Sequence, residues 1–252
     1  MTRPLLQVCE VTKDFGGLRV LRGVTLSIGA GELRCIIGPN GCGKTTLFNV
    51  ITGAFSPTSG TVWFRGAEIT HRPPHAISRL GIVRKFQVPG IYPTLAVAEN
   101  LEIPLLSRPG IAGPWSLLRA GARAAARSRE LLTRFGLRPQ AARAAAALPH
   151  GQKQWLEIAM LIASEAHVLL LDEPTAGMSA TETLATVALI RQLQQEHNIA
   201  ALVIEHDMTF VRRLDCPVTV MLRGSVLFEG SYAQVQAHPE VREAYLGHAA
   251  RA

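Results

Sequence analysis

The chain has 252 residues, 48% of them hydrophobic, and a formal net charge of +7. This length allows one full core or two smaller lobes, but the longest apolar stretches, Val168–Leu171 and Ile199–Ile204, are too short to span a membrane. The four cysteines lack C-x-x-C spacing, which argues against a zinc ribbon or a disulfide framework. No apolar leader follows Met1, so we expect no signal peptide.

The positive charge is compatible with nucleic acid, anionic lipid or an arginine-rich surface. Arginines concentrate between residues 119 and 143, where they alternate with alanines, and both residue types favour helices. Phe135 is the single aromatic residue of this region, so the region offers almost no aromatic side chains on which nucleic-acid bases could stack. We therefore expect a solvated helical face and no nucleic-acid partner.

The first third of the chain has the pattern of strands separated by glycine turns. A glycine-rich turn then opens a predicted helix from about residue 44 to residue 52, and a strand pattern returns between residues 61 and 86. The strands predicted in this part are Leu5–Val11, Val24–Ile28, Leu33–Ile37, Thr61–Phe64 and Ile82–Phe86.

The middle of the chain, from about 92 to 165, has a helical pattern, which prolines at 93, 104, 109, 114 and 139 are expected to divide into short pieces. Beyond it, strands are predicted at Val168–Leu171, Ala200–Ile204, Val218–Leu222 and Val226–Phe228, with helices at 181–196 and 207–214. Strand–helix alternation on both sides of a helical segment predicts an α/β core with a parallel sheet, carrying a helical lobe.

A complete G-x-x-x-x-G-K-T pattern runs from Gly38 to Thr45, between a predicted strand and a predicted helix. In this context glycines let backbone N–H groups surround a phosphate, and the helix N-terminus adds positive potential. Lys44 is expected to reach the β- and γ-phosphates, and the Thr45 hydroxyl to ligate Mg²⁺. The predicted nucleotide-contacting residues here are Gly38, Pro39, Asn40, Gly41, Cys42, Gly43, Lys44, Thr45 and Thr46.

Cys42 lies inside this loop, at the start of the predicted helix. Such a position lowers the pKa of a thiol and favours the reactive thiolate. The alternative is a buried, inert side chain.

Two further predicted strands end in polar residues. Asp172 and Glu173 follow the apolar run Val168–Leu171, where Asp172 is expected to hold Mg²⁺ and Glu173 to orient and deprotonate the attacking water. His206 ends the next strand, and ligands of α/β proteins bind at this edge of the sheet.

These features resemble the ABC-transporter ATPase family in order and spacing, over essentially the whole chain. The resemblance implies an α/β ABC-type P-loop ATPase fold, with an antiparallel β subdomain and a helical subdomain insert. It implies one ABC ATPase domain over 1–252, in which 1–91 and 166–252 form the core with the β subdomain. The helical subdomain, with the family's signature segment, would cover about 92–165.

The resemblance also implies roles for residues whose types alone say little. Gln87 would sense Mg²⁺ and the attacking water, and His206 would be catalytic with Glu173. Phe15 would stack on adenine beside Val20, although a buried turn aromatic is the alternative. The signature segment, which would contact the nucleotide of a facing subunit, comprises Leu148, Pro149, His150, Gly151 and Gln152.

Finer cues resemble importers of branched-chain amino acids, urea and short amides. They are Ala176-Gly177-Met178, Glu205-His206-Asp207-Met208 and the tail Glu243-Ala244-Tyr245-Leu246-Gly247. Arg84-Lys85-Phe86-Gln87 and the run from His150 to Glu157 look most like the urea-type ATPase subunit.

Two residues depart from the family pattern. Pro149 stands where the signature normally has serine, and it offers neither a hydroxyl nor an N–H, although proline suits the start of a helix. Ser179 stands where many relatives have an acidic or amide residue.

The implied function is an ATP-binding and ATP-hydrolysing subunit, with ATP and Mg²⁺ as cofactors, that energises an importer of one of these solutes. Its partners would be two integral-membrane permease subunits and a second ABC ATPase subunit, more often a different chain than a copy, with a solute-binding protein reached indirectly. Its location would be cytoplasmic, peripheral on the inner face of the membrane. The alternatives are an ABC-type ATPase acting on nucleic acid or ribosomes, and a low-turnover regulatory ATP-binding subunit.

Overall fold

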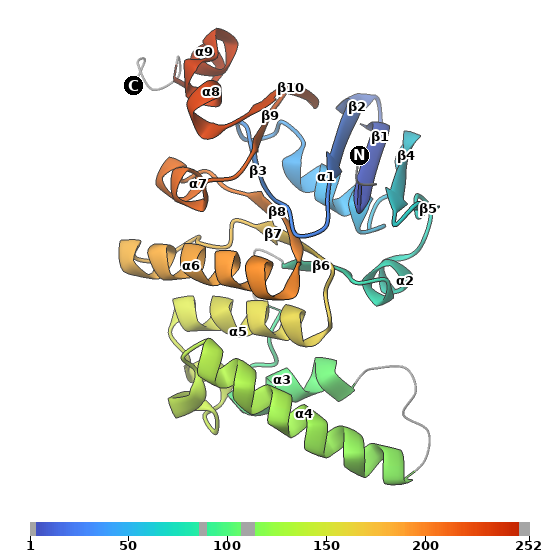
Figure 1. Ribbon diagram of the computed structural model, residues 1–252. Coiled ribbons are helices and arrows are strands. Elements are labelled where there is room, and N and C mark those ends of the chain that lie inside the picture. Colours follow the sequence, from blue (N-terminus) through green and yellow to red (C-terminus); the bar gives the residue numbers. More distant parts are fainter. Residues whose placement is uncertain (1–3, 86–89, 107–113, 247–252) are drawn as a thin grey trace. The chain divides into compact units, whose positions relative to one another are not determined.

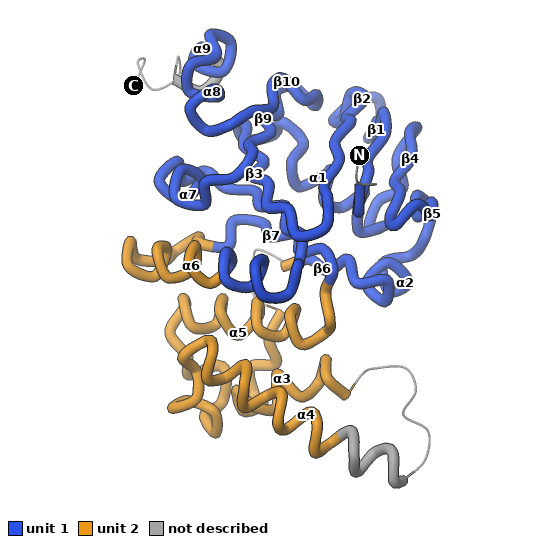
Figure 2. Tube along the Cα trace, viewed as in Figure 1, with its two compact units in different colours: residues 1–84, 167–174, 190–252 blue, residues 85–166, 175–189 orange. Residues whose placement is uncertain are grey.

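The computed structural model describes residues 4–85, 90–106 and 114–246 (Figure 1). These residues fall into two compact units, one made of 1–84, 167–174 and 190–252, the other of 85–166 and 175–189 (Figure 2). No helix in the described ranges combines the length and the apolar character that a membrane span requires.

The first unit holds two sheets. The four-stranded sheet has the order β2-β1-β4-β5, with β1 Leu6–Phe15, β2 Leu18–Ile28, β4 Ser59–Phe64 and β5 Ala67–Glu68. The pairs β1–β2, β1–β4 and β4–β5 are antiparallel. Gly16 and Gly17, with φ of 53° and 94°, turn the chain between β1 and β2, so these strands form a hairpin that is longer than predicted.

The six-stranded sheet has the order β10-β9-β3-β8-β7-β6. Its strands are β3 Leu33–Ile37, β6 Ile82–Lys85, β7 Val168–Asp172, β8 Ala200–Ile204, β9 Val218–Leu222 and β10 Ser225–Gly230. Strands β9, β3, β8 and β7 are parallel, and β10 is antiparallel to β9. Every residue of β7 and β8 is buried, as expected for central strands of a parallel sheet.

The first unit also contains α1 Lys44–Ile51, α2 Pro74–Arg79, the last part of α6 Ala180–His197, α7 Met208–Leu214, α8 Tyr232–Ala237 and α9 Pro239–Leu246. Its core joins residues of both sheets and α1, among them the fully buried Leu21, Phe48 and Leu170. The parallel α/β core predicted from the sequence is confirmed. The short helices α2, α8 and α9 were not predicted.

The second unit is helical. It contains α3 Val97–Leu106, α4 Pro114–Arg134, the 3₁₀ turns Arg138–Gln140 and Ala145–Ala147, α5 His150–Ala163 and the first part of α6 Ala180–His197. The prediction that Pro104 divides the helical region is wrong, because Pro104 lies inside α3. It is only two residues before the end of that helix, so the backbone N–H that it lacks weakens one terminal turn.

Candidate functional site

The register of the parallel sheet brings the predicted site residues of the first unit to one edge. Ile36 pairs with Ile204, and Ile204 pairs with Asp172, so β3, β8 and β7 end at the same level. The chain leaves these three strands through the glycine loop 38–43, through Glu205 and His206, and through Glu173.

The glycine loop joins β3 to α1, and its conformation requires glycine. Gly41 and Gly43 have φ of 78° and 104°, in the left-handed region that disfavours side chains. A Cβ at Gly38 would lie 2.3 Å from the Met221 carbonyl oxygen, and one at Gly43 would lie 2.8 Å from Leu21 Cδ2. The loop is therefore closely packed against neighbouring strands.

Lys44 turns back over this loop. Its side chain is buried, and Nζ donates hydrogen bonds to the carbonyl oxygens of Gly38 at 2.6 Å and Pro39 at 3.0 Å. The ammonium group and the first N–H groups of α1 thus lie at one loop, an arrangement that can hold a phosphate. Asn40 and Thr45 are exposed and Thr46 is half-buried.

Cys42 is buried, with 4% of its surface exposed. Burial raises the pKa of its thiol, and the nearby Lys44 ammonium opposes that shift only in part. The expected low-pKa, reactive thiolate is therefore wrong, and the alternative of a buried side chain holds. The reason is that desolvation of the thiolate outweighs the positive end of the helix.

Asp172 is fully buried at the end of β7. Its Oδ2 accepts hydrogen bonds from Thr45 Oγ1 at 3.3 Å and from Arg84 Nη2 at 2.7 Å. Within the described residues its Oδ1 has no hydrogen-bond partner. A buried carboxylate oxygen without a donor, next to a threonine hydroxyl, suits a hard cation such as Mg²⁺.

Arg84 is a site residue that the sequence reasoning missed. It lies in β6, donates to Asp172 and also to Asn49 Oδ1 of α1, and stacks 5.7 Å from the centre of the Phe48 ring. A signal was present, because an arginine within an apolar strand is rarely buried unless it is paired. Its partner, however, is 88 positions away in the sequence.

Glu173 and His206 meet at the sheet edge. His206 Nε2 lies 2.7 Å from Glu173 Oε1, and both side chains are partly exposed, by 39% and 30% respectively. The Glu173 backbone N–H donates to the Ile204 carbonyl at 2.9 Å, and this hydrogen bond continues the sheet. The φ of Glu173 is 49°, which is unfavourable for a residue with a side chain. Such backbone strain is typical of functional positions.

Phe15 and Val20 lie on the β1–β2 hairpin. Phe15 is 39% exposed, which excludes the buried turn aromatic considered as an alternative, and it packs edge-to-face on Phe55 with ring centres 5.3 Å apart. The Val20 carbonyl oxygen lies 3.1 Å from where a Cβ of Gly43 would be, so Val20 is beside the glycine loop.

The signature segment is in the second unit, at the start of α5. Leu148 is buried, and Pro149 is the N-cap, with extended backbone (φ −53°, ψ 156°) and no side-chain cap. A Cβ at Gly151 would lie 2.3 Å from Glu182 Oε1, so a larger residue here would displace the Glu182 side chain. Within the described residues the buried Gln152 Oε1 has no hydrogen-bond partner.

His150 and Ser179 form hydrogen bonds with residues between Ala176 and Glu182. His150 Nε2 hydrogen-bonds the Ala176 carbonyl at 3.0 Å. The Ser179 N–H and hydroxyl both donate to Glu182 Oε2, which lowers the pKa of that carboxyl, and Ser179 Oγ accepts from the Glu182 N–H. Ser179 thus caps α6 in a capping box. Gln87 lies outside the described residues.

Comparison with known proteins agrees with this geometry. A profile described as "ABC transporter" matches residues 21–176, and one described as "Branched-chain amino acid ATP-binding cassette transporter" matches residues 225–251. The chain is 38% identical to the high-affinity branched-chain amino acid transport ATP-binding protein BraF of Pseudomonas aeruginosa, over 99% of this chain and 100% of the relative. It is 37% identical to LivG of Escherichia coli K12, with the same coverage.

Solved structures show the same fold. The ADP conformation of an ATP-binding cassette from an ABC transporter superposes with a TM-score of 0.85 at 31% identity, covering 98% of this chain and 100% of that one. A nucleotide-free cassette gives a TM-score of 0.83 at 30% identity, covering 96% and 99%. The predicted ABC ATPase fold, with its antiparallel sheet and helical segment, is confirmed. The chain belongs to the ABC-transporter ATP-binding family, in the branch of the branched-chain amino acid transporters.

Proposed function

We propose that this chain binds and hydrolyses ATP to energise an importer of branched-chain amino acids, urea or short amides. Membership of the family makes ATP binding and coupling to a membrane permease its general role. The observation that carries the hydrolytic assignment is the 2.7 Å contact of His206 with Glu173, at the sheet edge that also bears Lys44 and Asp172.

In this proposal the glycine loop and Lys44 bind the phosphates of ATP, with Phe15 and Val20 beside the adenine. Thr45 and Asp172 would hold Mg²⁺, which neutralises phosphate charge when bound. Asp172 Oδ1, which has no hydrogen-bond partner among the residues that the structure describes, supports that assignment. Arg84 fixes the Asp172 carboxylate through the 2.7 Å ion pair.

Glu173 orients the attacking water and takes its proton, since it is partly exposed and therefore accessible to water. His206 donates to Glu173 or to the γ-phosphate and holds the carboxylate in position. Gln87 would complete this set.

We further propose that the site is completed by the signature helix of a second, related ATPase subunit, and that this chain's α5 serves the partner's site in return. The exposed Pro149 and His150 and the N-terminus of α5 are suited to face a phosphate. Docking on two permease subunits would place the pair at the inner face of the membrane, with the solute-binding protein on the other side.

The urea-type motifs, Arg84-Lys85-Phe86-Gln87 and the run from His150 to Glu157, support urea or a short amide. The relatives' branched-chain amino acid names support the other class. Reconstitution of this chain with its permease subunits and a solute-binding protein separates the two solute classes. Uptake of radiolabelled urea or leucine into ATP-loaded vesicles should identify the solute, and ATP hydrolysis that responds to neither solute nor permease would refute the transport role.

The two alternatives, an ATPase acting on nucleic acid or ribosomes and a low-turnover regulatory subunit, are not favoured, because the relatives are transport ATP-binding proteins.

A further inference from the structure

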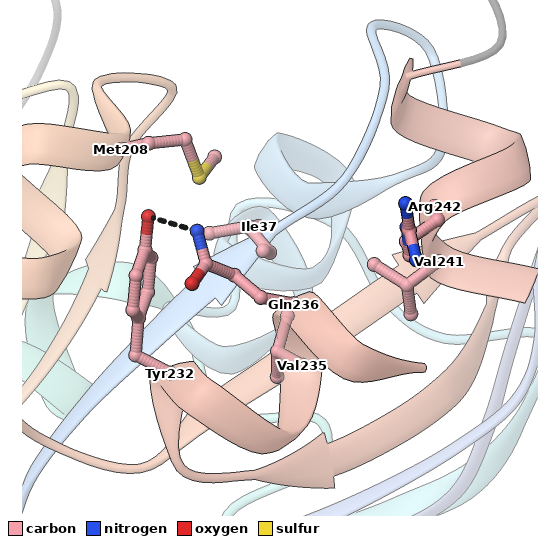
Figure 3. A pocket seen from close by; sticks show the side chains of 7 residues that line it. All are labelled: Ile37, Met208, Tyr232, Val235, Gln236, Val241 and Arg242. Carbon is pink, nitrogen blue, oxygen red and sulfur yellow. Dashed lines mark hydrogen bonds between the residues drawn. The ribbon is translucent and has the colours of Figure 1, made fainter. Parts of the chain in front are cut away.

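A pocket of about 340 Å³ lies in the first unit, between the end of β3, the start of α7, and helices α8 and α9 (Figure 3). Ligand pockets generally measure about 300–1,000 Å³, so it has room for a small molecule. Its apolar wall consists of Ile37, Met208, Val235 and Val241.

The polar groups of the pocket come from the two C-terminal helices. Gln236 Nε2 donates to Tyr232 Oη at 2.9 Å, and this bond leaves the tyrosine hydroxyl proton free to donate to a ligand. Arg242 lines the same pocket from α9 and is exposed. Among the described lining residues there is one cation and no carboxylate, so the pocket attracts anions.

We propose that this pocket binds a small aliphatic carboxylate. The carboxylate would pair with the Arg242 guanidinium, while the hydrocarbon part would cover Val235 and Val241. Ammonium compounds are disfavoured, because no lining carboxylate would receive them.

The position of the pocket couples its ligand to the nucleotide site. Ile37 directly precedes Gly38 of the glycine loop, and Met208 is two residues beyond His206. A ligand that contacts both residues acts on the two segments that carry Lys44 and His206. Because binding free energies are linked, the carboxylate and ATP should alter each other's affinity by the same factor.

The test titrates the full chain with 4-methylpentanoate, 4-methylpentan-1-ol and acetate by calorimetry. 4-Methylpentanoate should bind at least about tenfold more tightly than 4-methylpentan-1-ol or acetate, because the alcohol lacks the charge and acetate lacks the apolar chain. Arg242→Gln should remove the preference for acid over alcohol, and Val235→Trp should abolish binding by filling the pocket. Arg79→Gln, at an exposed arginine of α2, is the matched control.

Binding that is equal for acid and alcohol, or unaffected by Arg242→Gln, overturns the proposal, as does the lack of saturable binding. Circular dichroism verifies that each variant is folded. In the wild-type chain the acid should shift the Kd for ATP, and this shift should vanish in Val235→Trp.

A second, independent observation concerns two thiols. Cys35 is buried in β3, Cys216 is half-buried just before β9, and their Sγ atoms are 3.6 Å apart. The Cys35 N–H also donates to the Pro217 carbonyl at 3.0 Å, which fixes the two segments side by side. The hydrogen bond between the two thiols lowers the pKa of Cys216, and the positive charges of Arg191 and Arg34 lower it further.

We infer that Cys35 and Cys216 form a reversible disulfide with peroxide as oxidant. The Cys216 thiolate attacks H₂O₂, giving a sulfenic acid and hydroxide. The Cys35 thiol then attacks that sulfur, the S–S bond forms, and the sulfenic oxygen leaves as water after taking the Cys35 proton. The sulfur atoms need to approach from 3.6 Å to about 2.05 Å, a small movement within a pair of adjacent strands.

Mass spectrometry of the peroxide-treated chain tests this inference. The expected product is a disulfide joining the peptides that hold Cys35 and Cys216, reversed by dithiothreitol. The disulfide should disappear in Cys35→Ser and in Cys216→Ser, and it should persist in Cys9→Ser and Cys42→Ser. The Cys42→Ser control is needed because Cys42 and Cys35 lie in the same tryptic peptide. Oxidation that adds only oxygen to these cysteines, without the cross-link, would overturn it.

Discussion

At the scale of single residues, Lys44 is the group whose removal should most affect ATP binding. Its Nζ lies among the loop carbonyls of Gly38 and Pro39, where a phosphate would replace them as partner. Hydrogen bonds to charged groups contribute about 1.5–3 kcal/mol each, so Lys44→Ala should weaken ATP binding about ten- to a hundredfold or more. Fluorescent-nucleotide titration measures this, with the exposed Arg79→Ala as the control, and equal affinities would remove Lys44 from the phosphate site.

Cys42 shows that the environment of a residue can reverse the expectation drawn from its position. Burial raises the pKa of its thiol, so little thiolate exists at neutral pH. Alkylation of Cys42 by iodoacetamide should therefore be slower at pH 7 than that of an unperturbed thiol, and should accelerate as the pH rises above the usual thiol range. Peptide mass mapping over time measures the rate. Rapid labelling at pH 7 would contradict the buried placement.

At the scale of elements, the start of α5 decides how well this chain can serve a partner's site. Pro149 provides no side-chain cap, whereas a serine could satisfy one N–H of the first turn or bind a phosphate. The test uses a complex in which Glu173→Gln silences the ATP site of this chain, so that only the partner's site hydrolyses ATP. Pro149→Ser should then increase hydrolysis about ten- to a hundredfold, because one hydrogen bond to a charged group contributes that much.

The matched control for that experiment is Pro139→Ser, in a 3₁₀ turn of the same unit. A rate that stays the same in Pro149→Ser means that the proline only opens the helix and that the missing hydroxyl is unimportant. A higher rate in both variants would point to a general effect of removing a proline.

Helix α5 also contacts two residues of its own unit, Lys85 and Gly90, through Glu157. Glu157 Oε2 is 3.7 Å from Nζ of the fully buried Lys85, and Glu157 Oε1 accepts from the Gly90 N–H at 3.0 Å. Glu157→Ala should lower the free energy of unfolding by about 3–5 kcal/mol, because it removes the carboxylate facing a buried charge. Urea denaturation measures this, and the exposed Glu130→Ala should cost at most about 1 kcal/mol. Equal losses in the two variants would contradict the account.

At the scale of the whole molecule, local patterns predicted most of the fold and the elements that carry the site. The glycine loop, the strands before Asp172 and His206, and the helical region all follow from short-range signals such as glycine spacing and apolar runs. The contacts between these elements do not follow from short-range signals. Arg84 with Asp172 and Cys35 with Cys216 join residues 88 and 181 positions apart, and only the sheet order brings them together.

The C-terminal helices α8 and α9 were missed for a different reason. They have six and eight residues, too short for a clear periodic pattern, and α8 is held by a capping box between Ser231 and Gln234. Since these helices supply five of the seven described residues that line the pocket, the pocket was not predictable either.

The central claim is that Glu173, held by His206 at the edge of the sheet, is the base for ATP hydrolysis. The most direct measurement compares ATP hydrolysis and ATP affinity between the wild-type chain and Glu173→Gln. Each is assembled with the permease and with a partner ATPase subunit whose own ATP site is silenced. A general base contributes about 10²–10⁴-fold, so turnover should fall by at least about a hundredfold while the Kd for ATP stays within about threefold. Wild-type turnover in Glu173→Gln would contradict the account.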